Sequence, residues 1–302
     1  MEIISVIPRG YCQGVVRAIQ IAHKTAREHT KEPVYMLGMI VHNQFVVEAC
    51  KKEGIQFIES PDKTRLELLD EIDHGIVIFT AHGISDAVRK KAADKHLTIV
   101  DASCPDVEKT HKLVKDHIAK GGDVLYIGKK GHPESEGTVS LSDHVHLITS
   151  KEDINHLKGL RHVLITNQTT LSILDTKDII EACLKAYPDA QVSSEICNAT
   201  RIRQEAVMHL KDVDVLIVVG DKRSNNSNQL KQIGLSSGIH DAYLIDSVSD
   251  LQEDMVKGRN RIAVTSGSST PNELTKQVID FLKQYALDGK WNLPEPASVH
   301  LI

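Results

Sequence analysis

The sequence predicts an α/β fold with mostly parallel sheets, formed by three similar α/β domains in a pseudo-threefold arrangement. Strand-like apolar runs alternate with helical patterns along the whole chain of 302 residues. Three of the five cysteines, Cys12, Cys104 and Cys197, are evenly spaced, 92 and 93 residues apart. Each follows a β-rich stretch and opens a helical one. A thiol at the same strand-to-helix junction in each third of the chain indicates a unit that occurs three times around a common axis.

The expected elements follow from the periodicity of the apolar residues. Strands are expected at 3–7, 34–40, 76–80, 98–101, 123–127, 162–166, 214–219 and 261–265. Helices are expected at 14–29, 44–53, 85–95, 106–120, 175–187, 200–211, 226–237 and 272–285. Boundaries just before the second and third cysteine give domains 1–102, 103–195 and 196–286. The remaining segment, 287–302, contains Trp291 and two prolines, and we interpret it as a tail that docks over another domain or remains mobile.

Two polar segments in each domain follow expected strands at similar distances from the cysteine. They are VHNQ and TAHGIS, then GKKGHPESEG and TNQTTLS, then GDKRSNNSNQ and TSGSSTP. The distances from the cysteine to the central residue are 30 and 70, then 28 and 65, then 27 and 72 residues. Ligands bind beyond the carboxyl ends of strands in open α/β sheets, so these segments are candidate binding loops.

Composition excludes several classes of protein. The chain is 41% hydrophobic and 25% charged with a net charge of −5, which is ordinary for a globular protein. No basic run interleaved with aromatic residues argues for nucleic acid, and no apolar run approaches the ~20 residues of a membrane span. The N-terminus lacks the pattern of a signal peptide, and the cysteine count is odd. We therefore expect reduced thiols and a cytoplasmic protein.

The three evenly spaced cysteines are candidate metal ligands, because a helix N-terminus favours the thiolate. The alternative is three buried, inert thiols. Cys50 and Cys183 lie in the middle of expected helices with apolar neighbours, so for them a structural role is expected.

Three thiolates suit Zn²⁺ or an iron–sulfur cluster. Zinc sites usually contain a short C-x₂₋₄-C step, which this chain lacks. A [4Fe–4S] cluster normally takes four cysteines, and with three one iron keeps an exchangeable position. Such a cluster supplies both a Lewis acid and electrons. A zinc hydrolase acting on a phosphorylated small molecule and a non-enzymatic iron–sulfur sensor or carrier remain alternatives.

The polar segments supply further candidates. His42, His82 and His132 follow expected strands, either as structural residues or as metal ligands or donors to an anion. The SNNSN and SGSST runs suit an anion at a helix start, or ordinary helix capping. Glu134 is a candidate proton donor or a solvated loop acid.

These segments together resemble the 4-hydroxy-3-methylbut-2-enyl diphosphate reductases, which catalyse the last step of the methylerythritol phosphate pathway to isoprenoids. The resemblance runs from Pro8 to about Leu282 in the motifs PRGYCQGVVRAI, IVHNQ, FTAHGIS, DASCPDVEKTH, GHPESEG, TNQTTLS, EICNATRIRQEA, SNNSN and SGSSTP. It implies three α/β domains around a central [4Fe–4S] cluster held by Cys12, Cys104 and Cys197. It also implies ferredoxin or flavodoxin as the electron donor.

The resemblance further implies a role for each polar candidate. Glu134 would supply protons, and Thr169 would position the substrate hydroxyl or a water chain. The diphosphate would be bound by His42, His82, His132, Ser224, Asn226 and Ser269. Many members of the family carry a second serine where this chain has Asn225, whose amide can still donate. The implied products are isopentenyl diphosphate and dimethylallyl diphosphate.

Overall fold

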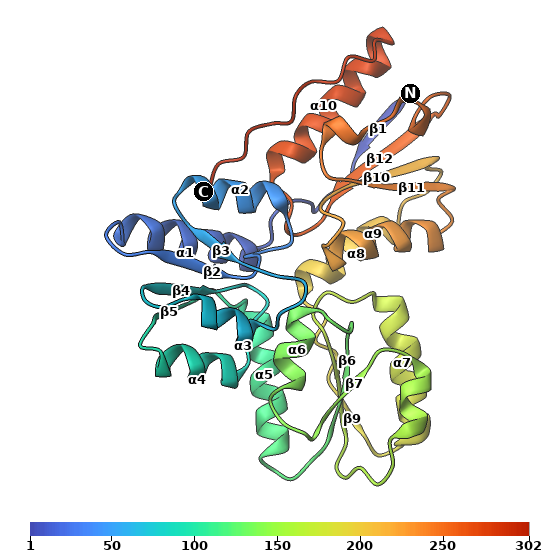
Figure 1. The fold of residues 1–302 in the computed structure, drawn as a ribbon. Coiled ribbons are helices and arrows are strands. Elements are labelled where there is room, and N and C mark those ends of the chain that lie inside the picture. Colours follow the sequence, from blue (N-terminus) through green and yellow to red (C-terminus); the bar gives the residue numbers. More distant parts are fainter. Residues whose placement is uncertain (302) are drawn as a thin grey trace. The chain divides into compact units, whose positions relative to one another are not determined.

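The computed structural model describes residues 1–301 (Figure 1). These residues form two compact units, one of residues 1–16, 42–49 and 198–301 and the other of residues 17–41 and 50–197. The described strands form three four-stranded sheets in which every neighbouring pair is parallel. The prediction of an α/β fold with three similar parallel sheets is confirmed. The arrangement of the three around an axis stays a prediction.

The three sheets share one strand order. When β1 (Glu2–Ser5) is counted as the last strand of its sheet and the other strands are numbered along the chain, the strands of each sheet lie in the order 2-1-3-4. The first sheet contains β2 (Val34–Leu37), β3 (Gln56–Ile58), β4 (Ile76–Phe79) and β5 (Thr98–Asp101). The second contains β6 (Val124–Ile127), β7 (Val145–Ile148), β8 (Leu164–Asn167) and β9 (Gln191–Val192). The third contains β10 (Val215–Val219), β11 (Asp241–Ile245), β12 (Arg261–Ser266) and, as its fourth strand, β1 (Glu2–Ser5).

The placement of β1 was not anticipated by the continuous domain ranges. The first strand of the chain pairs with β12, with Glu2 opposite Arg261 and Ser5 opposite Val264. Each cysteine therefore follows the fourth strand of one sheet, and the helix after it leads to the first strand of the next sheet. The boundaries near 102 and 195 stay a prediction, and residues 2–5 belong to the sheet of the third domain.

All eight expected helices form, within a few residues of their expected ends. The helices are α1 (Gln13–Glu28), α2 (Gln44–Lys52), α3 (Arg65–Leu68), α4 (Asp86–Asp94), α5 (Pro105–Ile118), α6 (Pro133–Val139), α7 (Ile173–Ala186), α8 (Asn198–Met208), α9 (Asn225–Ser236) and α10 (Asn272–Asp288). The sequence did not predict α3 and α6, which are short. Short 3₁₀ turns occupy Leu69–Glu71, Lys151–His156, Val248–Asp250 and Glu253–Met255.

Helices cover both faces of the third sheet (Figure 1). Alternate residues of β10 point to opposite faces, as the period of a strand requires. Val215, Ile217 and Val219 pack in the cluster that contains α10, whereas Leu216 and Val218 pack with α9. In the second sheet α7 covers one face and α5 the other, each with its own apolar cluster.

The C-terminal segment docks on the helix that precedes it. The ring of Trp291 lies edge-on to Phe281 and Tyr285, with centroids 5.0 and 4.9 Å apart. Gly289 ends α10 at φ 67°, a left-handed conformation that favours glycine and lets the chain turn back. Further along, Val299 and Leu301 pack in the same apolar cluster as Phe45 and Ala49 of α2. Whether this tail docks over another domain or remains mobile stays a prediction. In the described residues, no helix is long and apolar enough to cross a membrane.

Candidate active site

The strand order places the predicted site residues at switch points of the sheets. In the order 2-1-3-4, the connections from the adjacent strands 1 and 3 leave in opposite directions and open a crevice. His42, His132 and Ser224 follow a first strand, while His82, Thr169 and Ser269 follow a third strand. The predicted loops therefore lie where this topology creates binding sites.

The three evenly spaced cysteines share one local structure. Each half-buried thiol is the residue before a helix, and Cys104 is the N-cap of α5. Each cysteine N–H donates to a carbonyl after the neighbouring third strand, at 3.0 to 3.1 Å: Cys12 to Ser268, Cys104 to Ala81 and Cys197 to Thr169. In addition, the Val15 N–H donates to Cys12 Sγ at 3.4 Å. Thiols at such helix starts are candidate ligands of a soft metal.

Cys50 and Cys183 differ from these three. Both are fully buried inside helices, and burial raises the pKa of Cys50 to about 12 and that of Cys183 to about 11. Thiols that remain protonated in an apolar core are not metal ligands. The structural role expected for them is confirmed.

Glu134 lies in the first turn of α6 rather than in the loop expected from sequence, because His132 caps this helix and Pro133 begins it. Its carboxyl is 2% exposed. Thr169 donates its N–H to Oε1 at 2.7 Å and its hydroxyl to Oε2 at 3.0 Å. Burial raises the pKa of Glu134 to about 7 despite these bonds, and the charge of Asp106 adds to the rise. Such a carboxyl can exchange a proton near neutral pH.

Two of the predicted histidines, His82 and His132, lie close together within the unit of residues 17–41 and 50–197. The rings of His82 and His132 meet edge-on, with centroids 5.6 Å apart. His132 Nδ1 accepts the N–H of Glu134 at 3.2 Å, which assigns the ring proton to Nε2 in the neutral tautomer. His82 Nδ1 lies 3.4 Å from Thr80 Oγ1. The structure thus brings His82, His132, Glu134 and Thr169 together at the carboxyl ends of their strands.

Arg65 and Thr80 hold the His82 loop, and sequence reasoning missed both. The Arg65 guanidinium donates to Gly83 O at 2.7 Å and to Thr80 Oγ1 at 2.9 Å. Burial lowers the pKa of Arg65 to about 10, so it keeps its charge at neutral pH. Thr80 Oγ1 accepts from Arg65 and still has one lone pair and its own proton for His82 Nδ1, so this hydroxyl holds the imidazole in either neutral tautomer.

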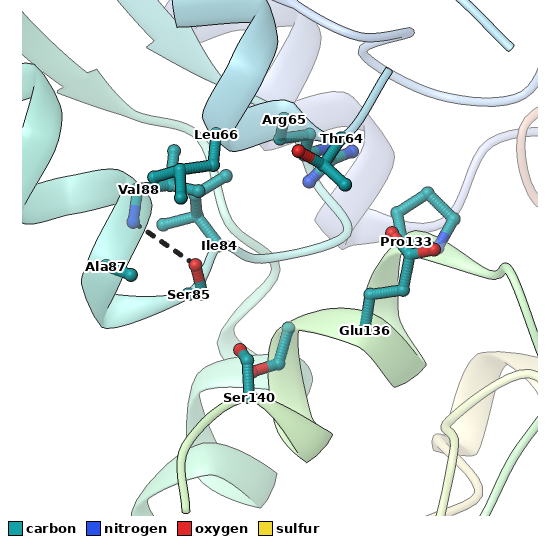
Figure 2. Close-up of a pocket in the computed structure, with 11 residues that line it drawn as sticks. Thr64, Arg65, Leu66, Ile84, Ser85, Ala87, Val88, Pro133, Glu136 and Ser140 are labelled. Atoms are coloured by element: carbon teal, nitrogen blue, oxygen red, sulfur yellow. Dashed lines mark hydrogen bonds between the residues drawn. The ribbon is translucent and has the colours of Figure 1, made fainter. Parts of the chain in front are cut away.

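A cavity of about 390 Å³ lies beside these loops. Figure 2 shows Arg65 and Ile84 on one side and Pro133 and Glu136 of α6 on the other. Ser85 caps α4 there by accepting the Val88 N–H. None of the predicted site residues lines this cavity.

Gln168 and Asn167, two further residues that sequence reasoning missed, connect the loops of the second sheet. Gln168 Oε1 accepts the Lys129 N–H at 3.0 Å and the Ser135 hydroxyl at 3.1 Å. Asn167 Oδ1 accepts the N–H of Glu195, two residues before Cys197, at 3.1 Å. Both side chains are fully buried. Their signal was the polar TNQTT run at the end of a strand, in which the sequence singled out only Thr169.

The candidate anion site gathers small polar groups at the start of α9. Ser224 is the N-cap, and its Oγ accepts the N–H of Ser227 at 3.3 Å and lies 3.5 Å from Ser269 Oγ. Asn225 and Asn226 begin the helix, and all of these residues are buried. A Cβ on Gly267 would lie 2.1 Å from Ser227 Oγ, so glycine permits the close approach of the two loops. Helix N–H groups and hydroxyls at one point are suited to bind a phosphate.

Asn226 and His42 have structural bonds in the same unit. Asn226 donates to Thr200 Oγ1 of α8 at 3.2 Å and accepts the Ser268 N–H at 3.1 Å, so it connects α8 to the loop after β12. Ser269 Oγ donates to the carbonyl of His42 at 3.1 Å. Asp221, which the sequence did not single out, accepts the Gln44 N–H at 3.1 Å. The His42 loop is thereby tied to both anion-site loops.

Thiols at three helix starts, a buried acid with a pKa of about 7 and small polar groups at the start of α9 are features typical of an α/β enzyme. Comparisons with known proteins agree. The chain matches the LytB protein family over residues 3–283 and belongs to it. It is accordingly an oxidoreductase.

Curated relatives include the 4-hydroxy-3-methylbut-2-enyl diphosphate reductases of Brevibacillus brevis and Bacillus licheniformis. The first is 50% identical over 94% of this chain and 92% of its own, and the second is 46% identical over 100% and 98%. A solved structure of E-1-hydroxy-2-methyl-but-2-enyl-4-diphosphate reductase from Plasmodium falciparum matches with a TM-score of 0.89 and 31% identity, over 97% of this chain and 94% of that one. The family named from the sequence motifs is confirmed.

Proposed function

We propose that this enzyme reductively removes the hydroxyl of 4-hydroxy-3-methylbut-2-enyl diphosphate and forms isopentenyl and dimethylallyl diphosphate. The reaction consumes two electrons and two protons and releases water. The observation that carries the proposal is Glu134, a fully buried carboxyl with a pKa of about 7, held by two bonds from Thr169. The relatives at 46–50% identity, named for this reaction, support it.

Cys12, Cys104 and Cys197 would hold a [4Fe–4S] cluster. When bound, the cluster supplies electrons one at a time and an iron with an open position that acts as a Lewis acid. The three helix starts that favour thiolates support this donor set. Cys50 and Cys183 lie in apolar surroundings that keep their thiols protonated, so they would not be ligands. We propose ferredoxin or flavodoxin as the source of electrons.

Glu134 would deliver protons through Thr169, whose hydroxyl lies 3.0 Å from Oε2 and can turn between the carboxyl and the substrate. One proton leaves with the hydroxyl as water, and the other adds to carbon. A carboxyl that is half protonated near neutral pH gives up a proton and regains it at comparable cost. Burial keeps this carboxyl away from bulk water, so protons are directed to the site.

The diphosphate would be bound by neutral and dipolar donors. Ser224, Ser269 and the first N–H groups of α9 offer a cradle, and Asn225 and Asn226 add amides. His82 and His132 would donate through ring N–H groups, and for His132 this is Nε2–H because its Nδ1 accepts the Glu134 N–H. We propose His42 as a further donor, held by the bond from Ser269 to its carbonyl.

The first test is the content of iron, zinc and acid-labile sulfide in protein purified without oxygen. About four irons and four sulfides per chain with a brown chromophore support the reductase. A turnover assay with a reduced dye then distinguishes an enzyme from a sensor. One zinc and no sulfide, after anaerobic reconstitution, would replace the reductase by a hydrolase.

A further inference from the structure

A basic side chain on each helix that follows a cysteine reaches the segment that leads into the next cysteine. On α1, Arg17 Nη1 donates to Ser103 O at 2.7 Å, next to Cys104. On α5, Lys109 Nζ donates to Glu195 Oε2 at 2.9 Å, two residues before Cys197. These two contacts lie within the unit of residues 17–41 and 50–197.

The third contact joins the last of these helices to the segment before the first cysteine. On α8, Arg203 Nη2 donates to Gly10 O at 2.7 Å, two residues before Cys12, within the other unit. The cations stand five, five and six residues after Cys12, Cys104 and Cys197. Thus the helix that follows each cysteine binds the segment just before the next cysteine, and the last helix binds the segment before the first cysteine.

The three contacts differ from ordinary surface ion pairs, because at least one partner in each contact is buried. Ser103 is 3% exposed, Glu195 8% and Arg203 4%. A guanidinium bonded to a buried carbonyl fixes the backbone strongly, because a charged donor forms a shorter and stronger hydrogen bond than a neutral one. Three thiolates on one centre repel one another, and this repulsion falls when each has a cation close by.

We propose that Arg17, Lys109 and Arg203 are positioning residues that fix the three cysteine ligands and offset the charge of the centre they hold; this rests on the proposed cluster. The contacts link the ligands in pairs, so loss of one cation loosens the cysteine of the following sheet. The cations also stabilise the reduced centre, which carries one more negative charge than the oxidised centre.

Lys109 gives the cleanest test, since its side chain is 70% exposed and its removal leaves the apolar clusters intact. In Lys109→Gln, the buried Glu195 carboxylate stays beside Cys197 without its cation. We expect the cluster to be lost to a chelator faster, by a factor on the order of 10, as for other residues that support metal ligands. The midpoint potential should shift to a more negative value.

The experiment compares four anaerobically reconstituted proteins. They are the wild type, Lys109→Gln, the conservative Lys109→Arg and the control Lys112→Gln, which removes an exposed charge from the same helix. Iron release to a chelator and an EPR-monitored redox titration are measured for each. Arg203→Gln joins the set if its circular dichroism melt matches the wild type, and the Lys109 series decides the matter without it.

Faster iron release and a more negative potential in Lys109→Gln alone, restored in Lys109→Arg, support the inference. Equal release rates and potentials in all four proteins overturn it and leave the cluster proposal intact. A wild type that takes up no iron and sulfide overturns the proposed function, and this inference with it.

Discussion

Replacement of Glu134 by glutamine tests the proton donor and its environment together. Glutamine has the same shape, and its Oε1 can still accept the Thr169 N–H that Glu134 accepts at 2.7 Å. It cannot carry a proton to the substrate. Because positioned acids contribute about 10²–10⁴ in rate, turnover should fall by that factor while iron and sulfide content stay unchanged.

The same substitution changes the pH dependence of stability. The pKa of Glu134 rises from 4.5 to about 7 on folding, so the folded chain favours the protonated carboxyl by about 3 kcal/mol. That stability is fully present below pH 4.5 and is lost as the pH rises to about 7. The glutamine side chain does not titrate. Between pH 5.5 and 8, the variant should therefore gain about 2 kcal/mol of unfolding free energy relative to the wild type.

Two assays check this reasoning. Anaerobic urea unfolding, followed by circular dichroism at pH 5.5 and 8, gives the change in unfolding free energy. Turnover with a reduced dye gives the rate, and the wild-type rate should fall above pH 7 as Glu134 loses its proton. Parallel pH–stability curves for the two proteins would refute the perturbed carboxyl. A variant with full turnover would remove Glu134 from the mechanism.

The remaining predictions concern the ligands and the anion site. Cys104→Ser should lose most iron and sulfide, whereas Cys50→Ser should keep both; equal metal content would contradict the donor set. Thr80→Val should raise KM roughly tenfold with little change in kcat, because it removes the hydroxyl that holds the His82 ring through Nδ1. Thr80→Ser, which keeps the hydroxyl, should restore the wild-type KM. Ser269→Ala should weaken binding of inorganic diphosphate about tenfold by calorimetry; unchanged affinity would exclude this hydroxyl from the site.

The central strands could be predicted from the sequence, whereas most edge strands could not. Every residue of β4, β6, β8 and β10 is buried, so their apolar runs are continuous. The missed strands β3, β7, β9 and β11 lie at sheet edges and are partly exposed, which dilutes the pattern. Strands buried on both faces carry a signal that half-exposed edge strands lack.

The candidate site was predictable where the chemistry is local in sequence. The cysteines, Glu134 and the serines of the anion site stand at strand ends, where topology alone makes a polar residue informative. Arg65 carries no such signal, because it reaches Thr80 and Gly83 only after α3 packs beside their loop. Asp221 acts on Gln44 across 177 residues of sequence. Contacts made by long side chains across the fold have no local pattern to detect.

The repeated strand order gives a physical basis for the proposed reduction, in which three similar sheets would have different roles. Each sheet presents one cysteine after its fourth strand and two loops after its first and third strands. The thiols are equivalent, but the loops differ: the second sheet carries the buried acid Glu134 with Thr169, and the third carries the small polar cradle of Ser224 and Ser269. Under the proposed mechanism, equivalent positions with unlike side chains would let one sheet supply protons and another hold an anion. The order of the chain makes β1 the fourth strand of the third sheet, so Cys12 stands in the same local frame as the other two cysteines.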